Sequence, residues 1–394
     1  MTLPLDRHAL ISAANGGDSG AQYALAASLH RDGQTAEAMQ WLERAAHSGH
    51  LHAQYTWAAR ELSGATPLKQ AQASIDLLRK SASAGVHQAK RLLSVVEAWG
   101  LKGAANWELA CQLLMDACEA GDPGALREAG LLWLLNNPGD EAAVRLVHAA
   151  ASKGDSIAQA FAGRFGFGDP NEPGTPPPRH QVEPHLRVPV DVPLKAPRPM
   201  LSAPKVVTIP GLLKAWECDY IIARAEPMLA PSQMIDEGTG KPKLATDRTS
   251  STAVFWPTAS DLVMTHLDAR MALAAGLPMR NGEMLNVLRY QPGQEYKPHF
   301  DVVDPAKAGS AQFLAEGGQR VRTLLVALND DYIGGETSFI RAKAQWRGAK
   351  GDALIFDNVT PDGAPDPMSL HAGLPVTQGV KWLASKWYRS AEHW

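Results

Sequence analysis

The chain is poor in cysteine, with three in 394 residues. Cys111, Cys118 and Cys218 are too few and too widely scattered for a disulfide framework or a thiolate zinc site. An excess of one charge is also missing. The formal net charge is -3, so no overall basic field favours nucleic acid or an anionic membrane surface. We therefore expect no nucleic-acid partner.

Long apolar runs are absent as well. No run approaches the roughly 18 residues of a membrane-spanning helix. The N-terminal stretch MTLPLDRHALISAANGG lacks the basic and apolar regions of a signal peptide. Hydrophobic residues make up 45% and charged residues 20%, as in soluble globular proteins. These observations predict two or three domains, no membrane partner and a location in the reducing cytoplasm.

A repeating pattern occupies the N-terminal part of the chain. In each copy a glycine follows a pair of small residues and precedes an alanine by four positions, and successive glycines lie 32, 36, 36 and 33 residues apart. The glycines are Gly17, Gly49, Gly85, Gly121 and Gly154, and the alanines are Ala21, Ala53, Ala89, Ala125 and Ala158. Glycine can end a helix in the left-handed conformation, and alanine lets two helices approach closely, so this period predicts stacked helical hairpins. The stretches GDSGAQYALA, GHLHAQYTWA and GDSIAQAFAG resemble Sel-one-like repeats, relatives of tetratricopeptide repeats, which implies a binding scaffold over residues 1–168.

A proline-rich segment follows the repeats. Ten of the 30 residues from Pro170 to Pro199 are proline, which lacks an amide donor and restricts φ. The composition predicts an extended, polyproline-II-like interdomain linker over residues 169–200, in which His180 and His185 have no role. A lesser alternative is that the linker itself enters the catalytic site as a ligand or substrate.

The hydrophobic pattern changes in the last 190 residues to the alternation typical of strands. Strands are expected at Val206–Ile209, Met284–Tyr290, Arg322–Leu328, Ala353–Asp357 and Lys381–Tyr388, and helices at Trp216–Leu229 and 260–275. Many short strands with few helices indicate a sandwich or jelly roll. The polar stretch Ile235–Arg248 is expected to be a mobile lid or an ordinary surface loop.

Three residues form a candidate metal site. His299 and Asp301, in YKPHFD, would point to one face of a strand because they are two residues apart. His371, in SLHAGLP, is the candidate third ligand. Two histidines and one carboxylate with open positions suit a non-haem Fe(II) oxygenase.

Lys381 is a candidate anchor for a co-substrate. On the strand KWLASKWY it shares a face with Leu383, Ser385 and Trp387. A lysine on an inward apolar face is costly unless an anion pairs with it. A dicarboxylate that binds the metal with one end and the ammonium with the other meets this requirement.

The region from about residue 204 to the end resembles the Fe(II)/2-oxoglutarate-dependent prolyl 4-hydroxylases. The resemblance is carried by DRTSS, YQPGQEYKPHFD, GGQRVRTLLVALND, GGETSF, KGDALIFDNVTPDGAPDPMSLHAGLPV and GVKWLASKW. It implies a catalytic domain over residues 201–394 with the double-stranded β-helix (jelly-roll) fold and flanking helices. The expected fold class is therefore multidomain, with an all-α helical-repeat solenoid ahead of this domain.

The resemblance also implies roles for individual residues. His299, Asp301 and His371 would be the iron ligands, and Lys381 would pair with the distal carboxylate of 2-oxoglutarate. Tyr290 and Thr337 would hydrogen-bond to that co-substrate. Positions that contact the peptide in the family correspond here to Arg248, Ser250, Glu283, Tyr296, Arg320 and Trp387. The implied cofactors are Fe(II), 2-oxoglutarate and O₂, with ascorbate as a candidate reductant.

Glu283 raises a geometric question, because it lies seven residues before Tyr290. A regular strand would place the two side chains on opposite faces. Either a bulge intervenes or Glu283 lies outside the strand.

The leading functional hypothesis is 4-hydroxylation of a peptidyl proline, on a protein or peptide substrate that the repeat domain recruits. A second hypothesis keeps the chemistry but changes the substrate to another side chain, a small peptide natural product or a free amino acid. A third is a catalytically inactive solenoid adaptor. The presence of all three ligands and of Lys381 favours an enzyme.

Overall fold

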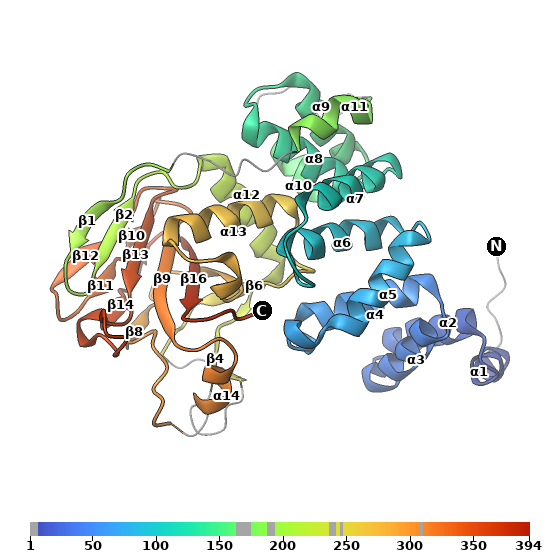
Figure 1. Ribbon diagram of the computed structural model, residues 1–394, viewed down its shortest axis with the longest axis horizontal. Coiled ribbons are helices and arrows are strands. Elements are labelled where there is room, and N and C mark those ends of the chain that lie inside the picture. Colours follow the sequence, from blue (N-terminus) through green and yellow to red (C-terminus); the bar gives the residue numbers. More distant parts are fainter. Residues whose placement is uncertain (1–6, 163–174, 187–193, 236–241, 245–246, 308–309) are drawn as a thin grey trace. The chain divides into compact units, whose positions relative to one another are not determined.

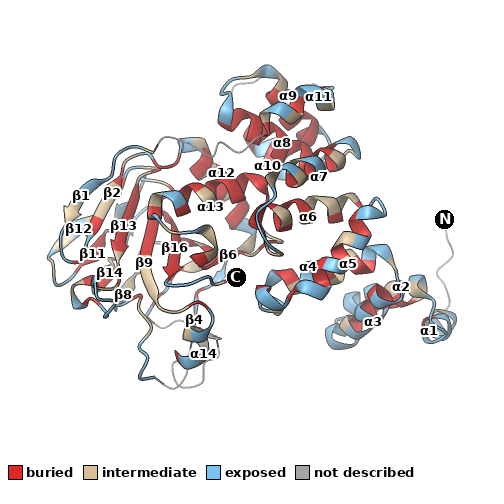
Figure 2. Cartoon of the chain, viewed as in Figure 1, coloured by how far each residue is buried: buried red, intermediate tan, exposed pale blue. Residues whose placement is uncertain are grey.

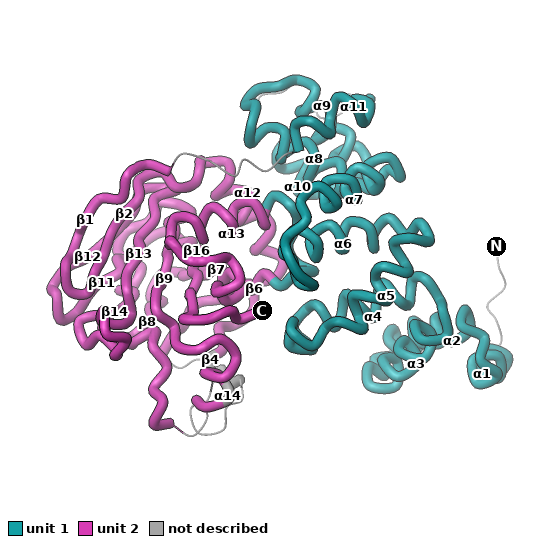
Figure 3. Tube along the Cα trace, viewed as in Figure 1, with its two compact units in different colours: residues 1–188, 256–263 teal, residues 189–255, 264–394 magenta. Residues whose placement is uncertain are grey.

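The computed structural model describes residues 7–162, 175–186, 194–235, 242–244, 247–307 and 310–394. The chain divides into two compact units, one of residues 1–188 with 256–263 and one of residues 189–255 with 264–394 (Figure 3). The first unit is helical and the second is built mainly from antiparallel strands. Within the described residues, no helix combines the length and apolar character needed to cross a membrane.

The helical unit is a run of antiparallel hairpins, each helix packing on the next (Figure 1). Its main helices are α1 (Arg7–Asn15), α2 (Ser19–Arg31), α3 (Thr35–His47), α4 (Leu51–Arg60), α5 (Gln72–Ser83), α6 (His87–Trp99), α7 (Trp107–Glu119), α8 (Pro123–Asn136), α9 (Glu141–Ser152) and α10 (Ser156–Ala162). This arrangement confirms the helical-repeat solenoid that the sequence period predicts.

The five repeat glycines close the helices as predicted. Their φ angles lie between 79° and 95°, a left-handed conformation that side chains with a Cβ rarely adopt. The backbone carbonyls of the two small residues before each glycine accept the hydrogen bonds that end the helix. In the second copy, Gly49 donates its N–H to Ala46 and His50 donates to Ala45. Four of the five repeat alanines are fully buried where the helices meet, namely Ala53, Ala89, Ala125 and Ala158.

Part of the described proline-rich segment is helical, contrary to the prediction of an extended linker. Residues Arg179–Val182 form helix α11, and Glu183–His185 form a 3₁₀ turn. Val182 and Leu186 are buried, so the turn is stabilised by packing rather than by local propensity. Residues 169–174 and 187–193 of the predicted linker lie outside the described residues, and its C-terminal end is extended in strand β1 (Arg198–Leu201).

His185 packs this segment against the repeats. Its ring stacks on Trp133 of α8, with centroids 4.2 Å apart and planes at 5°. Its backbone carbonyl accepts from Asn136, and its Nδ1 lies 3.2 Å from the Asn137 amide. Cys111 of α7 donates its thiol to the carbonyl of Leu186. The segment thus covers one side of the last repeats and acts as part of the solenoid.

The second unit contains two sheets that face each other. The larger has the strand order β1-β2-β13-β9-β16-β7-β6-β3, and the smaller has the order β12-β11-β14-β8. The strands are β1 (Arg198–Leu201), β2 (Val206–Ile209), β3 (Ala230–Pro231), β6 (Ser251–Phe255), β7 (Leu285–Tyr290), β8 (Tyr296–His299), β9 (Arg320–Ala327), β11 (Thr337–Phe339), β12 (Ala344–Trp346), β13 (Ala353–Asp357), β14 (His371–Gly373) and β16 (Lys381–Arg389). Two short pairs accompany them, β4 (Gln233–Ile235) with β5 (Pro242–Leu244) and β10 (Ile333–Gly334) with β15 (Val376–Gln378).

The core of this unit lies between the two sheets, as the red strands of Figure 2 show. Phe339 of β11 meets Phe356 of β13 edge to face, with ring centroids 5.2 Å apart. The flanking helices are α12 (Ala215–Ala225), α13 (Leu262–Ala275) and the short α14 (Ser310–Ala315). Two packed antiparallel sheets with flanking helices confirm the predicted jelly-roll architecture.

His185→Ala should loosen the segment that covers the last repeats. Loss of the stack on Trp133 should lower the free energy of local opening by about 1 kcal/mol, which raises the population of the open state about fivefold. Hydrogen–deuterium exchange of the full chain should therefore show faster exchange in peptides from 175–186 and α8. His180→Ala is the matched control, because His180 is exposed. Equal exchange in both variants would contradict the role given to His185.

Candidate metal and co-substrate site

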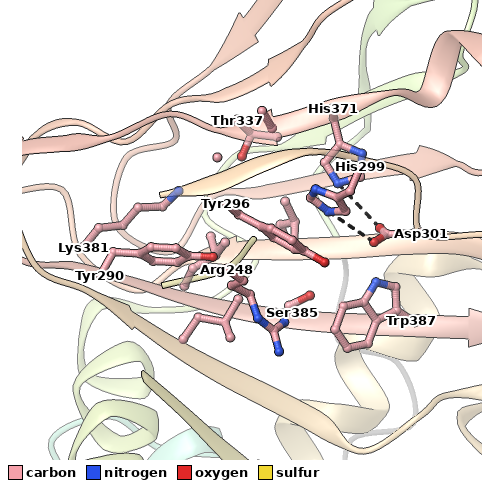
Figure 4. A pocket seen from close by; sticks show the side chains of 15 residues that line it. Arg248, Tyr290, Tyr296, His299, Asp301, Thr337, His371, Lys381, Ser385 and Trp387 are labelled. Atoms are coloured by element: carbon pink, nitrogen blue, oxygen red, sulfur yellow. Dashed lines mark ion pairs between the residues drawn. The ribbon is translucent and has the colours of Figure 1, made fainter. Parts of the chain in front are cut away.

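Two neighbouring strands of the smaller sheet carry the two candidate histidine ligands. β8 and β14 are antiparallel, and their register places His299 directly opposite His371. The imidazole centroids are 4.2 Å apart. Asp301 follows β8 by two residues, and its carboxylate turns toward both rings (Figure 4).

The donor atoms of these three residues converge on one point. His299 Nε2 lies 3.6 Å from Asp301 Oδ1, and His371 Nε2 lies 3.7 Å from Asp301 Oδ2. All candidate donor atoms lie within 4.8 Å of one another. Ligand atoms that share one ion lie about 2 Å from it. Small movements of these three side chains toward one another would therefore let all three bind one metal ion. The structure therefore brings together the three ligands that the sequence predicts.

Backbone carbonyls orient both imidazoles. His299 Nδ1 lies 2.8 Å from the carbonyl of Lys297, and His371 Nδ1 lies 2.9 Å from the carbonyl of Ser369. A carbonyl oxygen only accepts, so each Nδ1 carries the hydrogen. Each Nε2 then presents its lone pair to the site, as a metal ligand requires.

The charges of the site suit a cation. Burial, with the neighbouring His299, lowers the pKa of His371 to about 4, so the ring is neutral at neutral pH. Burial alone would raise the pKa of Asp301, but His371, His299 and the Thr323 hydroxyl hold it well below its usual range. The site thus offers two imidazoles and one carboxylate, the donor set of non-haem Fe(II) oxygenases.

A pocket opens beside the candidate ligands. One face of β16 lines the pocket. Lys381, Leu383, Ser385 and Trp387 lie on this face, as their two-residue spacing in the sequence predicts. The residues that line the pocket are Arg248, Leu288, Tyr290, Tyr296, His299, Asp301, Leu325, Thr337, His371, Ala372, Gly373, Lys381, Leu383, Ser385 and Trp387.

Lys381 reaches into this pocket from the strand end away from the metal ligands (Figure 4). Its side chain is 4% exposed, and its Nζ donates to the carbonyl of Gly335 at 2.6 Å. Burial lowers the pKa of its ammonium group to about 8, against the opposing effect of Glu336. Tyr290, its cross-strand neighbour, lies with its ring 5.4 Å from Nζ. This cation is placed to receive an anionic group.

Arg248 and Tyr296 form one wall. The guanidinium lies 5.3 Å from the Tyr296 ring, and NH2 donates to the carbonyl of Gln233 at 3.0 Å. Tyr296 in turn stacks on His299, with centroids 3.4 Å apart. Burial raises the pKa of Tyr296 to about 12, so its hydroxyl stays protonated. Ser250 lies just outside the lining and hydrogen-bonds to Ser232 at 2.8 Å.

Glu283 and Arg320 lie behind the pocket wall rather than on it. Glu283 lies outside β7, which is one of the two arrangements that its spacing requires. Its Oε1 accepts from Arg320 Nε at 2.6 Å and its Oε2 from Arg320 NH2 at 2.7 Å. The Arg320 guanidinium lies 4.3 Å from the Trp387 ring, so this ion pair supports the indole that lines the pocket.

Sequence reasoning missed Arg389, which donates to the same Glu283 carboxylate at 2.9 Å. A signal for it exists, because Arg389 continues the alternation of Lys381 and Trp387 along β16. The predicted lid at Ile235–Arg248 falls partly on residues 236–241 and 245–246, which lie outside the described residues.

Comparison with known proteins agrees with this geometry. Residues 285–389 match the 2OG-Fe(II) oxygenase superfamily. Prolyl 4-hydroxylase 5 of Arabidopsis thaliana is 37% identical over 213 residues, which span 48% of this chain and 69% of that protein.

Two solved structures are similar to different parts of the chain. The viral collagen prolyl hydroxylase of Paramecium Bursaria Chlorella virus-1, in complex with 2OG, is 28% identical, with a TM-score of 0.37, over 47% of this chain and 96% of the viral one. A Sel1 repeat protein from Oxalobacter formigenes is 26% identical, with a TM-score of 0.33, over 38% of this chain and 63% of that protein.

The identity to the plant enzyme extends over more than two thirds of its length, and the matched superfamily region contains the whole His299–Asp301–His371 set. By these relations the chain belongs to the prolyl 4-hydroxylase family of 2OG-Fe(II) oxygenases.

Proposed function

We propose that the chain hydroxylates peptidyl proline at C4, on a protein or peptide that its helical unit recruits. The observation that carries this proposal is the hydrogen-bonding character of the pocket. Among the described lining residues, the buried polar atoms without a partner are Arg248 Nε and Trp387 Nε1, and both are donors. Proline in a peptide has no N–H, so its backbone offers acceptors only. A pocket with spare donors and apolar walls is complementary to such a residue.

The residues on the metal side have distinct tasks in this proposal. His299, Asp301 and His371 hold Fe(II), and Lys381 pairs with the distal carboxylate of 2-oxoglutarate, assisted by Tyr290 and Thr337. When bound, the iron with 2-oxoglutarate and O₂ supplies the oxidation, in which 2-oxoglutarate yields succinate and CO₂ and one oxygen atom enters a substrate C–H bond.

The remaining residues hold the substrate and exclude water. Arg248 and Trp387 donate to peptide carbonyls, and Tyr296 completes that wall. Glu283 and Arg320 act through Trp387, whose ring they hold in place. The helical unit raises the effective concentration of a tethered substrate near the pocket. Ascorbate as reductant and a cytoplasmic location stay predictions.

Peptide turnover tests the substrate directly. The full chain, with Fe(II), 2-oxoglutarate and O₂, should add one oxygen to a proline-containing peptide and release succinate, whereas a matched peptide with alanine at that position should stay unmodified. Fragmentation mass spectrometry should place the oxygen on proline. Oxygen on another side chain, or turnover only with a free amino acid, would favour the second hypothesis. His299→Ala should abolish both products.

Trp387→Phe should raise the KM for the peptide about fivefold, because it removes one N–H donor worth about 1 kcal/mol while it keeps the ring beside Arg320. The affinity for 2-oxoglutarate should not change. Leu383→Met is a matched control on the same face of β16, because it conserves side-chain volume and removes no donor. An unchanged peptide KM in Trp387→Phe would argue against the donor role of the indole.

The affinity for 2-oxoglutarate should depend on pH through Lys381. Burial places the pKa of Lys381 near 8 in the free enzyme, so the ammonium form dominates below that pH. The dissociation constant should therefore be flat below about pH 7 and rise about tenfold per pH unit well above pH 8. Calorimetric titration with Mn(II) in place of iron would measure this dependence.

Two controls isolate the charge pair. Lys381→Met should weaken 2-oxoglutarate binding roughly 100-fold or more, because one partner of a buried ion pair is lost, and should remove the pH dependence. The affinity for 2-oxobutyrate, which lacks the distal carboxylate, should not depend on the protonation of Lys381. The same pH profile for both ligands would contradict the pairing.

A further inference from the structure

A chain of two hydrogen bonds supports Asp301 from the side away from the pocket. Thr323, on the central strand β9, lies with its Oγ1 2.6 Å from Asp301 Oδ2. Asn358, just after β13, lies with its Nδ2 2.9 Å from Thr323 Oγ1. Thr323 is 1% exposed and Asn358 is fully buried. Both residues lie in the larger sheet region, whereas the two histidine ligands belong to the smaller sheet.

The direction of both hydrogen bonds follows from the number of protons. An ionised carboxylate only accepts, so the single hydroxyl proton of Thr323 goes to Asp301. The threonine oxygen then has only lone pairs left for Asn358, so the amide must turn its NH₂ toward it. Asn358 is itself fixed through its backbone, because its N–H donates to Val321 at 2.9 Å and its carbonyl accepts from Asp366 at 3.0 Å.

This arrangement makes the two carboxylate oxygens of Asp301 unequal. Oδ2 receives a short, charge-assisted hydrogen bond from the hydroxyl. Each oxygen also lies near one imidazole, Oδ1 at 3.6 Å from His299 Nε2 and Oδ2 at 3.7 Å from His371 Nε2, so the hydrogen bond to Thr323 is what distinguishes them. The hydrogen bond from Thr323 uses a lone pair of Oδ2, which makes that oxygen the weaker donor to an ion.

We propose that Thr323 and Asn358 are positioning residues that keep Asp301 a one-oxygen ligand. The proposal rests on the metal and co-substrate of the proposed function, but not on the identity of its substrate. Three protein atoms, two atoms of a chelating 2-oxo acid and one O₂ fill six positions. A second carboxylate oxygen on the ion would compete for one of them. The hydroxyl at Oδ2 removes that competitor and orients Oδ1.

Metal binding by three proteins tests this proposal without turnover. Wild type, Thr323→Val and Thr323→Ser would be titrated with Co(II), with calorimetry for affinity and visible absorption for coordination. Valine keeps the shape of threonine and lacks the hydroxyl, so affinity should fall about 10- to 100-fold, as is typical when a partner of a metal ligand is lost. The Co(II) spectrum should also change. Serine restores the hydroxyl, so its affinity should stay within about twofold of wild type.

The outcomes separate positioning from simple structural support. Circular dichroism and thermal melting establish that each variant is folded, and Thr323→Ala replaces the valine variant if that one does not fold. Wild-type affinity and an unchanged Co(II) spectrum in the valine variant would overturn the proposal. So would a serine variant as weak as the valine one, because the restored hydroxyl would then fail to restore metal affinity. Failure of proline hydroxylation alone would leave these binding results unaffected.

Discussion

The site depends on the pairing register of β8 and β14, which sets His299 directly opposite His371. A slip of one residue would turn one imidazole to the other face of the sheet, because side chains alternate along a strand. These strands have only four and three residues, so their own hydrogen bonds do not suffice to hold the register. The core between the sheets supports it. Phe356 of the larger sheet meets the His371 ring at 4.8 Å, and Phe339 packs against Phe356.

The pocket keeps opposite charges apart at its two ends. Asp301 is ionised beside the two imidazoles, and Lys381 carries its charge at the other end of the β16 face. Buried charges are costly unless they are paired or bind a metal. Iron at one end and a dicarboxylate that spans the pocket satisfy both groups at once. The donors Arg248 Nε and Trp387 Nε1 have no partner in the structure, and under the proposed function they would bind the substrate.

The sequence predicted the parts of the structure that follow from periodicity. The repeat glycines, the inward face of β16 and the long strands all come from patterns that persist over many residues. Strands of three residues, such as β11 and β14, carry too few positions for an alternation to be recognised. Residues 179–185 were expected to be extended because of nearby prolines, but the stack of His185 on Trp133 joins positions far apart in the chain. The pairing of Glu283 with Arg320 and the hydroxyl of Thr323 at Asp301 likewise need the folded sheet, because no local pattern marks them.

The most direct test of the account is comparative peptide mass spectrometry in the native host. Cells with the intact chain would be compared with cells that carry only the His299→Ala chain, in a search for residues that gain one oxygen. The account predicts that prolines in one or a few proteins gain oxygen only with the intact chain, and these proteins should bind the isolated full-length His299→Ala chain. Oxygen gained only on residues other than proline, or no gain in any protein while the intact chain turns over 2-oxoglutarate, would contradict it.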